Sequence, residues 1–151
     1  MGGSAVVQEV LELAGVPYEL VDREATVRTV VLLEGNLLRL VVIPAGDRLD
    51  LERARRALRA GGTLRTATAA EVAEDFPGFD PATLPPLGHE AVPDVVSLAL
   101  LYLDDVVLAG GIRIDVRDLL RLCEPRVADL CLSGRTAGRS PWSSGRRPPI
   151  A

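Results

Sequence analysis

The chain has 151 residues, 48% of them hydrophobic, which is enough apolar material for one compact domain with its own core. This composition excludes a largely disordered chain, and the absence of a run of about 18 uncharged apolar residues argues against a transmembrane helix. The start of the chain lacks a basic region and carries Glu9 and Glu12, so it predicts an amphipathic helix instead of a signal peptide, and we expect a cytoplasmic protein.

The net charge of −4 is unevenly distributed along the chain. Residues 134–151 contain four Arg and no acidic residue, which leaves 13 basic and 21 acidic residues, a net charge of −8, in residues 1–133. Because so acidic a body is a poor match for long nucleic-acid contacts, any contact with RNA should involve only a short end. We therefore divide the chain into a domain at 1–132 and a tail at 133–151, rich in Arg, Ser, Pro and Gly, that is expected to be disordered.

The first half of the domain predicts two helices and a β-hairpin. In chain order we expect a helix that starts after Ser4 and stops at Gly15, an extended run at 18–21, two β-rich runs at 26–33 and 37–43 joined by Glu34-Gly35-Asn36, and a helix at 51–60 capped by Asp50 and ended by Gly61-Gly62. Leu51, Ala54, Ala57 and Leu58 form the apolar stripe of that second helix. Both β-rich runs are apolar on both faces, which favours strands inside a larger sheet.

The second half predicts a capped helix, a long ordered loop and several short strands. We expect a strand at 63–66, a helix from a Thr68–Glu71 capping box to about Asp75, a loop at 76–93, strands at 94–98, 100–103, 106–109 and 112–116, a helix at 117–123 capped by Asp115, and a final apolar run at 127–132. The loop holds both phenylalanines, which favours a loop that is ordered and forms a site. Irregularly interleaved strands and helices indicate a mixed α+β fold.

General catalytic motifs are absent from the sequence, so single residues carry the functional hypotheses. Cys123 and Cys131 have no metal-ligand spacing and there is one His, so we expect reduced, buried thiols, no metal and no cofactor. His89 is interpreted as a loop side chain. Arg28 lies in a β-rich run among apolar neighbours, where it is either paired or edge-exposed, or a pocket cation that meets an anionic or carbonyl group of a ligand.

The order of these motifs resembles one known family. The run VRTVVLLEGNLLRLVVIPAGDRLDLERARRAL, followed by TATAAEVAEDFPGF, LPPLG, VVLAGG, IDVRDLLRL and RVADL, is similar to the YbaK-like aminoacyl-tRNA deacylases, also called prolyl-tRNA synthetase-associated editing domains. The similarity covers roughly residues 5–132. It implies an α+β domain with a curved, largely antiparallel mixed sheet and flanking helices.

The resemblance also implies a function and a set of site residues. The family hydrolyses the ester between a mischarged small amino acid and the 3′ end of tRNA, so the expected partners are that aminoacyl-tRNA end and an aminoacyl-tRNA synthetase, with no membrane. Carried onto this chain, the family lysine falls on Arg28, backbone groups at Gly88 and Gly110 would bind the carbonyl oxygen, and the substrate-binding residues are Thr29, Pro86, Leu87, Ala109 and Gly111. The alternative is a non-catalytic or truncated relative that binds such an end without hydrolysis.

The chain departs from the family pattern in three places. It contains no lysine at all, and the Arg28 guanidinium keeps the positive charge but cannot give up its proton. The stretch between Asp22 and Val27 is shorter than in the family, which usually has an extra helix there. Ala109 stands where many members have Ser.

Overall fold

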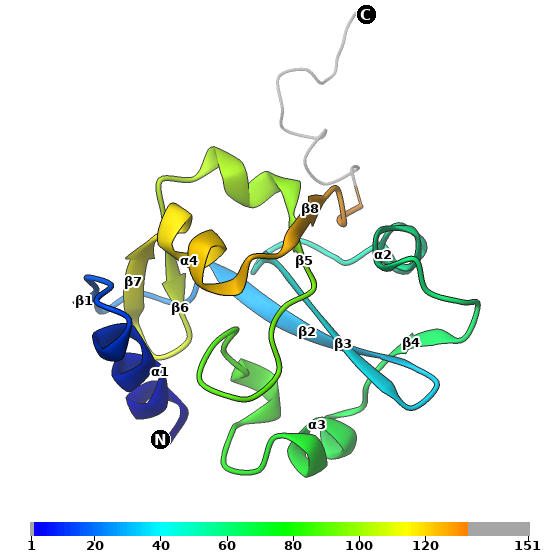
Figure 1. The fold of residues 1–151 in the computed structure, drawn as a ribbon, viewed down its shortest axis with the longest axis horizontal. Helices are drawn as coiled ribbons and strands as arrows, with labels where there is room; N and C mark the ends of the chain where they lie inside the picture. The colour runs from blue at the N-terminus through cyan, green and yellow to red at the C-terminus, as the bar shows by residue number, and fades with distance from the viewer. Residues whose placement is uncertain (1, 133–151) are drawn as a thin grey trace, which may run out of the picture.

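The computed structural model describes residues 2–132, and side chains from residue 5 onward. Figure 1 shows the described elements and their arrangement. In chain order they are α1 Gly2–Leu13, β1 Glu19–Leu20, β2 Val27–Glu34, β3 Leu37–Pro44, α2 Leu51–Leu58, β4 Leu64–Thr66, α3 Ala69–Asp75, η1 Pro81–Thr83, β5 Val95–Ser97, η2 Leu98–Tyr102, β6 Asp105–Leu108, β7 Ile112–Asp115, α4 Val116–Cys123 and β8 Arg126–Ala128. Within this part of the chain, none of the helices has the length and apolar character needed to span a membrane. The predicted tail at 133–151 lies outside the described residues.

Two sheets form the framework of the fold. The larger has the strand order β4-β2-β3-β5-β8, in which β2 pairs antiparallel with β3 and β4, whereas β3–β5 and β5–β8 are parallel pairs. The smaller has the order β1-β7-β6 and is antiparallel throughout. The mixed α+β class is therefore confirmed, and the strands are divided between two sheets, whereas the resemblance implied one.

The β2–β3 hairpin is confirmed, and it is the longest strand pair of the fold. Eight residue pairs run from Val27↔Pro44 to Glu34↔Leu37, so the turn consists of Gly35 and Asn36. Gly35 has a φ of 61°, a conformation that glycine adopts without steric cost. The two strands cross the middle of the molecule in Figure 1, between the smaller sheet with α1 and the α2–β4 end.

Side chains of β2 alternate between hydrophobic clusters on its two faces, as the period of a strand requires. Val30 and Leu32 belong to a cluster that includes Ala54 and Leu58 of α2. Val31 packs on the opposite face with Val72 and Phe76, from the α3 region. A third cluster joins α1 and α4 to the smaller sheet, with buried residues such as Leu11, Ile112 and Leu119. This two-sided burial explains why the strand is apolar on both faces.

Three predicted elements need correction. The predicted strand at 100–103 is wrong: Leu98–Tyr102 is a 3₁₀ helix in which Leu100 alone is buried and the Ser97 hydroxyl accepts a hydrogen bond from the Ala99 N–H at 3.3 Å. Helix α2 ends at Leu58, because Arg59 adopts a left-handed conformation before Gly61 is reached. Its predicted stripe is buried at Ala54 and Leu58 but exposed at Leu51. Helix α1 begins at Gly2, so Ser4 lies inside it.

The loop at 76–93 is ordered by its aromatic residues, as the sequence predicts. The rings of Phe76 and Phe79 pack edge-on against His89, with centroids 4.9 and 5.6 Å from it. His89 Nε2 donates a hydrogen bond to the Pro85 carbonyl oxygen at 2.7 Å. These contacts fix the direction of the segment at 84–89. They also give His89 the structural role expected of a loop side chain.

Candidate functional site

A cavity of about 270 Å³ opens where β2 begins. Four segments surround it: the linker between β1 and β2, the first residues of β2, the turn after β3 and the end of η1, with Ala109 from the turn between β6 and β7 closing the set. The lining residues are Glu24, Ala25, Val27, Arg28, Thr29, Ala45, Ala82, Thr83, Leu84 and Ala109. Three of the residues predicted from the sequence, Arg28, Thr29 and Ala109, thus line one cavity.

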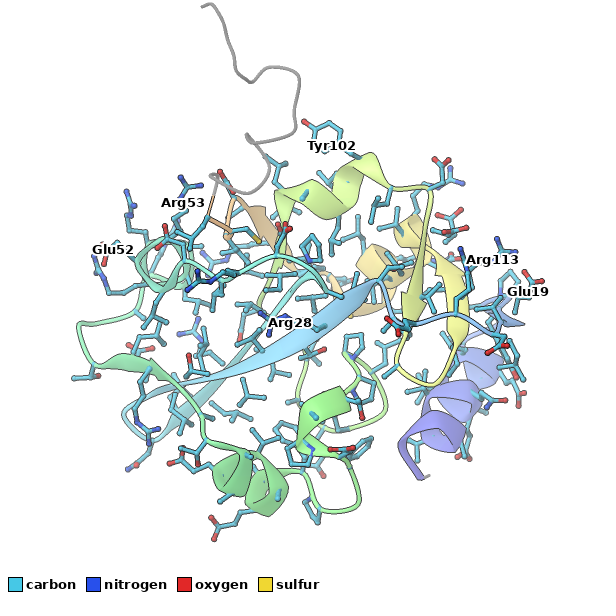
Figure 2. All side chains as sticks on the ribbon, turned by 180° about the vertical axis from the view of Figure 1, so that it is seen from behind. Glu19, Arg28, Glu52, Arg53, Tyr102 and Arg113 are labelled. Atoms are coloured by element: carbon cyan, nitrogen blue, oxygen red, sulfur yellow. The ribbon has the colours of Figure 1, made fainter. Side chains whose placement is uncertain are left out.

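Arg28 lies at the exposed edge of this cavity. Its Nη2 donates a hydrogen bond to the Asp47 carbonyl oxygen at 3.2 Å, and its side chain is exposed. Figure 2 shows the side chain in front of β2. The expectation of apolar neighbours is wrong, because α2 covers this face of the strand at Val30 and Leu32 but not at Arg28. The guanidinium is therefore held on one side by a backbone carbonyl and can still reach a ligand.

Thr29 brings a hydroxyl that has no protein partner to the same cavity. The residue is partly buried, and its Oγ1 atom is buried without a hydrogen bond to any described residue. Leaving such a group unpaired costs about 1–3 kcal/mol. A ligand with a polar group at this place would recover that cost.

The predicted Pro86, Leu87 and Gly88 line a second cavity, of about 390 Å³. That cavity lies against α1 and α4, which contribute Val10 and Cys123. Leu87 is buried in the cluster that joins α1 to the smaller sheet. The structure therefore does not bring these three residues into the cavity of Arg28.

Gly88 is required by packing as well as by backbone conformation. Its φ is 96°, and a Cβ atom there would lie 3.1 Å from Val6 Cγ1 on α1. This close approach to α1 accounts for the glycine without any role toward a ligand.

Gly110 and Gly111 form the turn that follows Ala109. At Gly111, φ is 77° and a Cβ atom would overlap the carbonyl oxygen of Val21, so this glycine allows β1 to approach β7. Gly110 is exposed, and its N–H forms no backbone hydrogen bond with any described residue. Of the two, Gly110 is the one with a free donor near the cavity.

Sequence reasoning missed Glu24, Ala25, Ala45, Ala82, Thr83 and Leu84 as lining residues. Ala45 belongs to the Pro-Ala motif of the resemblance, which is a signal that could have indicated it. The linker and η1 residues carry no such signal, because only tertiary structure places these segments beside β2.

Two larger hollows in the described part of the chain suit a ligand less well. One, of about 440 Å³, is lined by acidic residues and by Arg113, whose guanidinium is already paired with Glu19 and Asp105. The other, of about 580 Å³, lies over the aromatic residues of the 76–93 loop and has Asp75 and Glu90 but no cation among its lining residues. Neither offers an anion-binding group that is free of a carboxylate partner.

Within residues 2–132, no group of His, Cys, Asp or Glu side chains is arranged to hold a metal ion. Cys123 and Cys131 are both free and buried, as the sequence predicts. Burial raises the pKa of the Cys123 thiol to about 12, so it is not a thiolate at neutral pH. Neither cysteine lines the Arg28 cavity. The cavity can position and polarise a ligand, but its side chains provide no thiolate and no histidine base.

An α+β domain with a small cavity, one guanidinium and no nucleophile is thus the class that fold and site define. The sequence model of the family described as "aminoacyl-tRNA editing domain" matches residues 4–115. The chain therefore belongs to the aminoacyl-tRNA editing domain family. No curated protein matches it.

Solved structures show the same fold. A candidate trans-editing enzyme for prolyl tRNA synthetase is 27% identical, with a TM-score of 0.73, and the match covers 87% of this chain and 98% of that one. A hypothetical protein is 22% identical, with a TM-score of 0.70 and coverage of 84% and 99%. A candidate signal transduction protein from Marinobacter aquaeolei VT8 is 20% identical, with a TM-score of 0.64, and the match covers 88% of this chain but 32% of that longer one. The latter two similarities concern the fold alone.

Proposed function

We propose that this protein is an aminoacyl-tRNA deacylase that acts in trans and hydrolyses the ester of a mischarged small amino acid on the 3′ end of tRNA. The observation that carries the proposal is the cavity at the start of β2, where a guanidinium and an unpaired hydroxyl meet four alanines. Family membership supports the reaction class, and the printed description of the 27% identical neighbour supports action in trans beside a synthetase.

The cavity walls favour a small amino-acid side chain. Apart from Arg28, Glu24 and two threonines, the lining consists of Ala25, Val27, Ala45, Ala82, Leu84 and Ala109. Its volume of about 270 Å³ is just below the range of roughly 300–1,000 Å³ that is usual for ligand pockets. The aminoacyl group and the ribose edge would therefore enter, while the adenine base would rest outside.

Positioning and charge stabilisation would do most of the catalytic work. Arg28 would donate hydrogen bonds to the ester carbonyl or the ribose, and the Gly110 N–H would be a second donor to the developing oxyanion. Water would add to the carbonyl carbon, the bond from that carbon to the ribose oxygen would break, and the ribose oxygen would take a proton from the attacking water. Arg28 cannot accept that proton, so its role is electrostatic.

Substitution of Arg28 tests this proposal. With a tRNA carrying a mischarged small amino acid, Arg28→Ala should lower the deacylation rate about 100-fold, the usual effect of removing one oxyanion donor. Arg126→Ala is the matched control, because Arg126 is exposed on the edge strand β8 and lines no part of the cavity. Equal rates for the wild-type protein and Arg28→Ala, or no release above buffer, would refute catalysis by this site.

The second candidate function is binding of an aminoacyl end without hydrolysis. The observation that favours it is the guanidinium itself, which replaces the family lysine and cannot exchange its proton. Arg28→Lys separates the two candidates. A gain of activity from an inactive wild-type protein would mean that the cavity is intact and that hydrolysis was lost with the side chain.

A further inference from the structure

We infer that Glu24 recognises the α-ammonium group of the aminoacyl substrate and so selects free aminoacyl ends over uncharged analogues. This inference rests on the proposed function, because it names the substrate feature that the same cavity would bind. It concerns specificity, and it assigns Glu24 no part in the bond-breaking step.

The cavity contains two opposite charges that do not neutralise each other. Glu24 and Arg28 are the only ionisable residues in its lining. No ion pair joins them, and Glu24 has no hydrogen bond or ion pair with any other described residue. Arg28 is bound only through the Asp47 carbonyl oxygen. Both charges are therefore available to a ligand between them.

The linker that carries Glu24 is fixed at both ends. The Val21 N–H donates to the Gly111 carbonyl oxygen at 2.8 Å, and the Thr26 N–H donates to the Val107 carbonyl oxygen at 2.9 Å. The Thr26 hydroxyl also accepts a hydrogen bond from the Val107 N–H at 2.9 Å. Three hydrogen bonds thus tie this short segment to the smaller sheet. The Glu24 backbone is held beside the cavity before any ligand arrives, which reduces the cost of ordering it on binding.

An aminoacyl ester has the matching pattern of charge. Its α-amino group is largely protonated near neutral pH and lies one carbon away from the ester carbonyl. A carboxylate on one wall would accept hydrogen bonds from the ammonium group, while the guanidinium donates to the carbonyl oxygen. An analogue with a hydroxyl in place of the ammonium group has nearly the same size but loses the charge. Glu24 should therefore distinguish the two by charge and not by shape.

Binding of two matched, non-hydrolysable probes tests the inference. The probes are 3′-deoxyadenosine with either an alanyl or a lactyl group joined to a 3′-amino group through an amide, and calorimetry gives each Kd. The wild-type protein should bind the alanyl probe about tenfold more tightly than the lactyl probe, as expected for a hydrogen bond to a charged group. Glu24→Gln should remove this preference. Glu74→Gln, an exposed substitution on α3 outside the cavity, should retain it.

The possible outcomes separate this inference from the proposed function. Equal affinity of the wild-type protein for the two probes, no binding of either, or a preference that survives Glu24→Gln would overturn the role of Glu24. If deacylation of mischarged tRNA persists in that case, the proposed function stands without it. If deacylation is absent but the Glu24-dependent preference is found, the ammonium site is supported and the protein binds aminoacyl ends without hydrolysing them.

Discussion

At the scale of single residues, the candidate site depends on polar groups that the protein leaves incompletely paired. Arg28 is held by one carbonyl oxygen, Glu24 has no partner among the described residues, and Thr29 Oγ1 is buried without a hydrogen bond. Elsewhere in the described chain, many Arg side chains pair with carboxylates, as Arg65 does with Glu71 and Arg113 does with Glu19 and Asp105. Polar groups left unpaired around one cavity are those with the most to gain from a ligand.

Thr29→Val should have opposite effects on stability and activity. Valine keeps the shape and the strand propensity of threonine but removes the unpaired hydroxyl, so the unfolding free energy should rise by about 1 kcal/mol. Deacylation should fall, because a substrate would lose a hydrogen-bonding group. Thermal unfolding and the deacylation rate measure the two effects.

The control for this substitution is Thr66→Val, on the exposed face of β4. It should leave the activity unchanged. A lower melting temperature for Thr29→Val would show that the hydroxyl is already satisfied in the native protein, and this would remove one of the arguments for the cavity.

At the scale of elements, capping side chains define where the helices around the site begin. Asp50, Thr68 and Asp115 cap α2, α3 and α4, as their positions in the sequence predict. Two carboxylates at these helix ends have a low pKa. Hydrogen bonds from the Arg65 side chain and the Thr68 backbone lower the pKa of Glu71 to about 2, and those from the Arg117 side chain and backbone lower that of Asp115 to about 2.

Asp115→Asn should reduce stability in a way that depends on pH. The pKa of Asp115 in the folded protein, about 2, lies below its ordinary value of 3.8. The carboxylate therefore stabilises the fold above about pH 4, and this contribution is lost as the pH falls toward 2. Asparagine keeps a capping oxygen but not the charge, so its melting temperature should be a few degrees lower at pH 7 and should approach that of the wild-type protein near pH 2.

Thermal unfolding between pH 2 and pH 7 measures this difference. Asp75→Asn, at the exposed end of α3, should show no comparable convergence, because no ion pair of Asp75 with a described residue is broken. A difference between Asp115→Asn and the wild-type protein that stays constant down to pH 2 would contradict the role of the charge.

At the scale of the whole molecule, charge separates the domain from the sequence that follows it. Residues 1–133 have a net charge of −8, and residues 134–151 have four Arg and no acid. The core ends close to this boundary: Leu130 and Cys131 are buried, and the Leu130 carbonyl oxygen accepts a hydrogen bond from the Asp50 N–H at 2.8 Å. An acidic domain that binds the end of a tRNA would benefit from a basic segment for the phosphates beyond it.

Truncation to residues 1–132 should preserve the melting temperature within about 2 °C, because every buried core residue of the described chain is retained. Affinity for full-length tRNA should fall. Its salt dependence, the slope of log K against log salt concentration, should decrease by at most about 3 when four cations are removed. Filter binding at several salt concentrations gives this slope. The rate with a minimal aminoacyl-adenosine ester should be unchanged, and a loss of that rate would show that the tail contributes to the site.

The sequence by itself determined the elements whose signals are local. The Gly35-Asn36 turn, the capping residues Asp50, Thr68 and Asp115, and the phenylalanines that order the 76–93 loop were all predicted, because their physics involves residues close together in the chain. The family followed from the order of motifs. The error at 100–103 also has a local cause, since a short apolar run fits a strand and a 3₁₀ turn equally well.

Only the tertiary structure decided which side chains meet. It placed Glu24 opposite Arg28, moved Gly88 and Leu87 to a second cavity, and left Arg28 at an exposed edge because α2 ends its cover at Val30. These facts depend on how a linker, a turn and a 3₁₀ helix approach one strand across long separations in sequence. Such approaches are fixed by packing against the whole core, and no local pattern of residues encodes them.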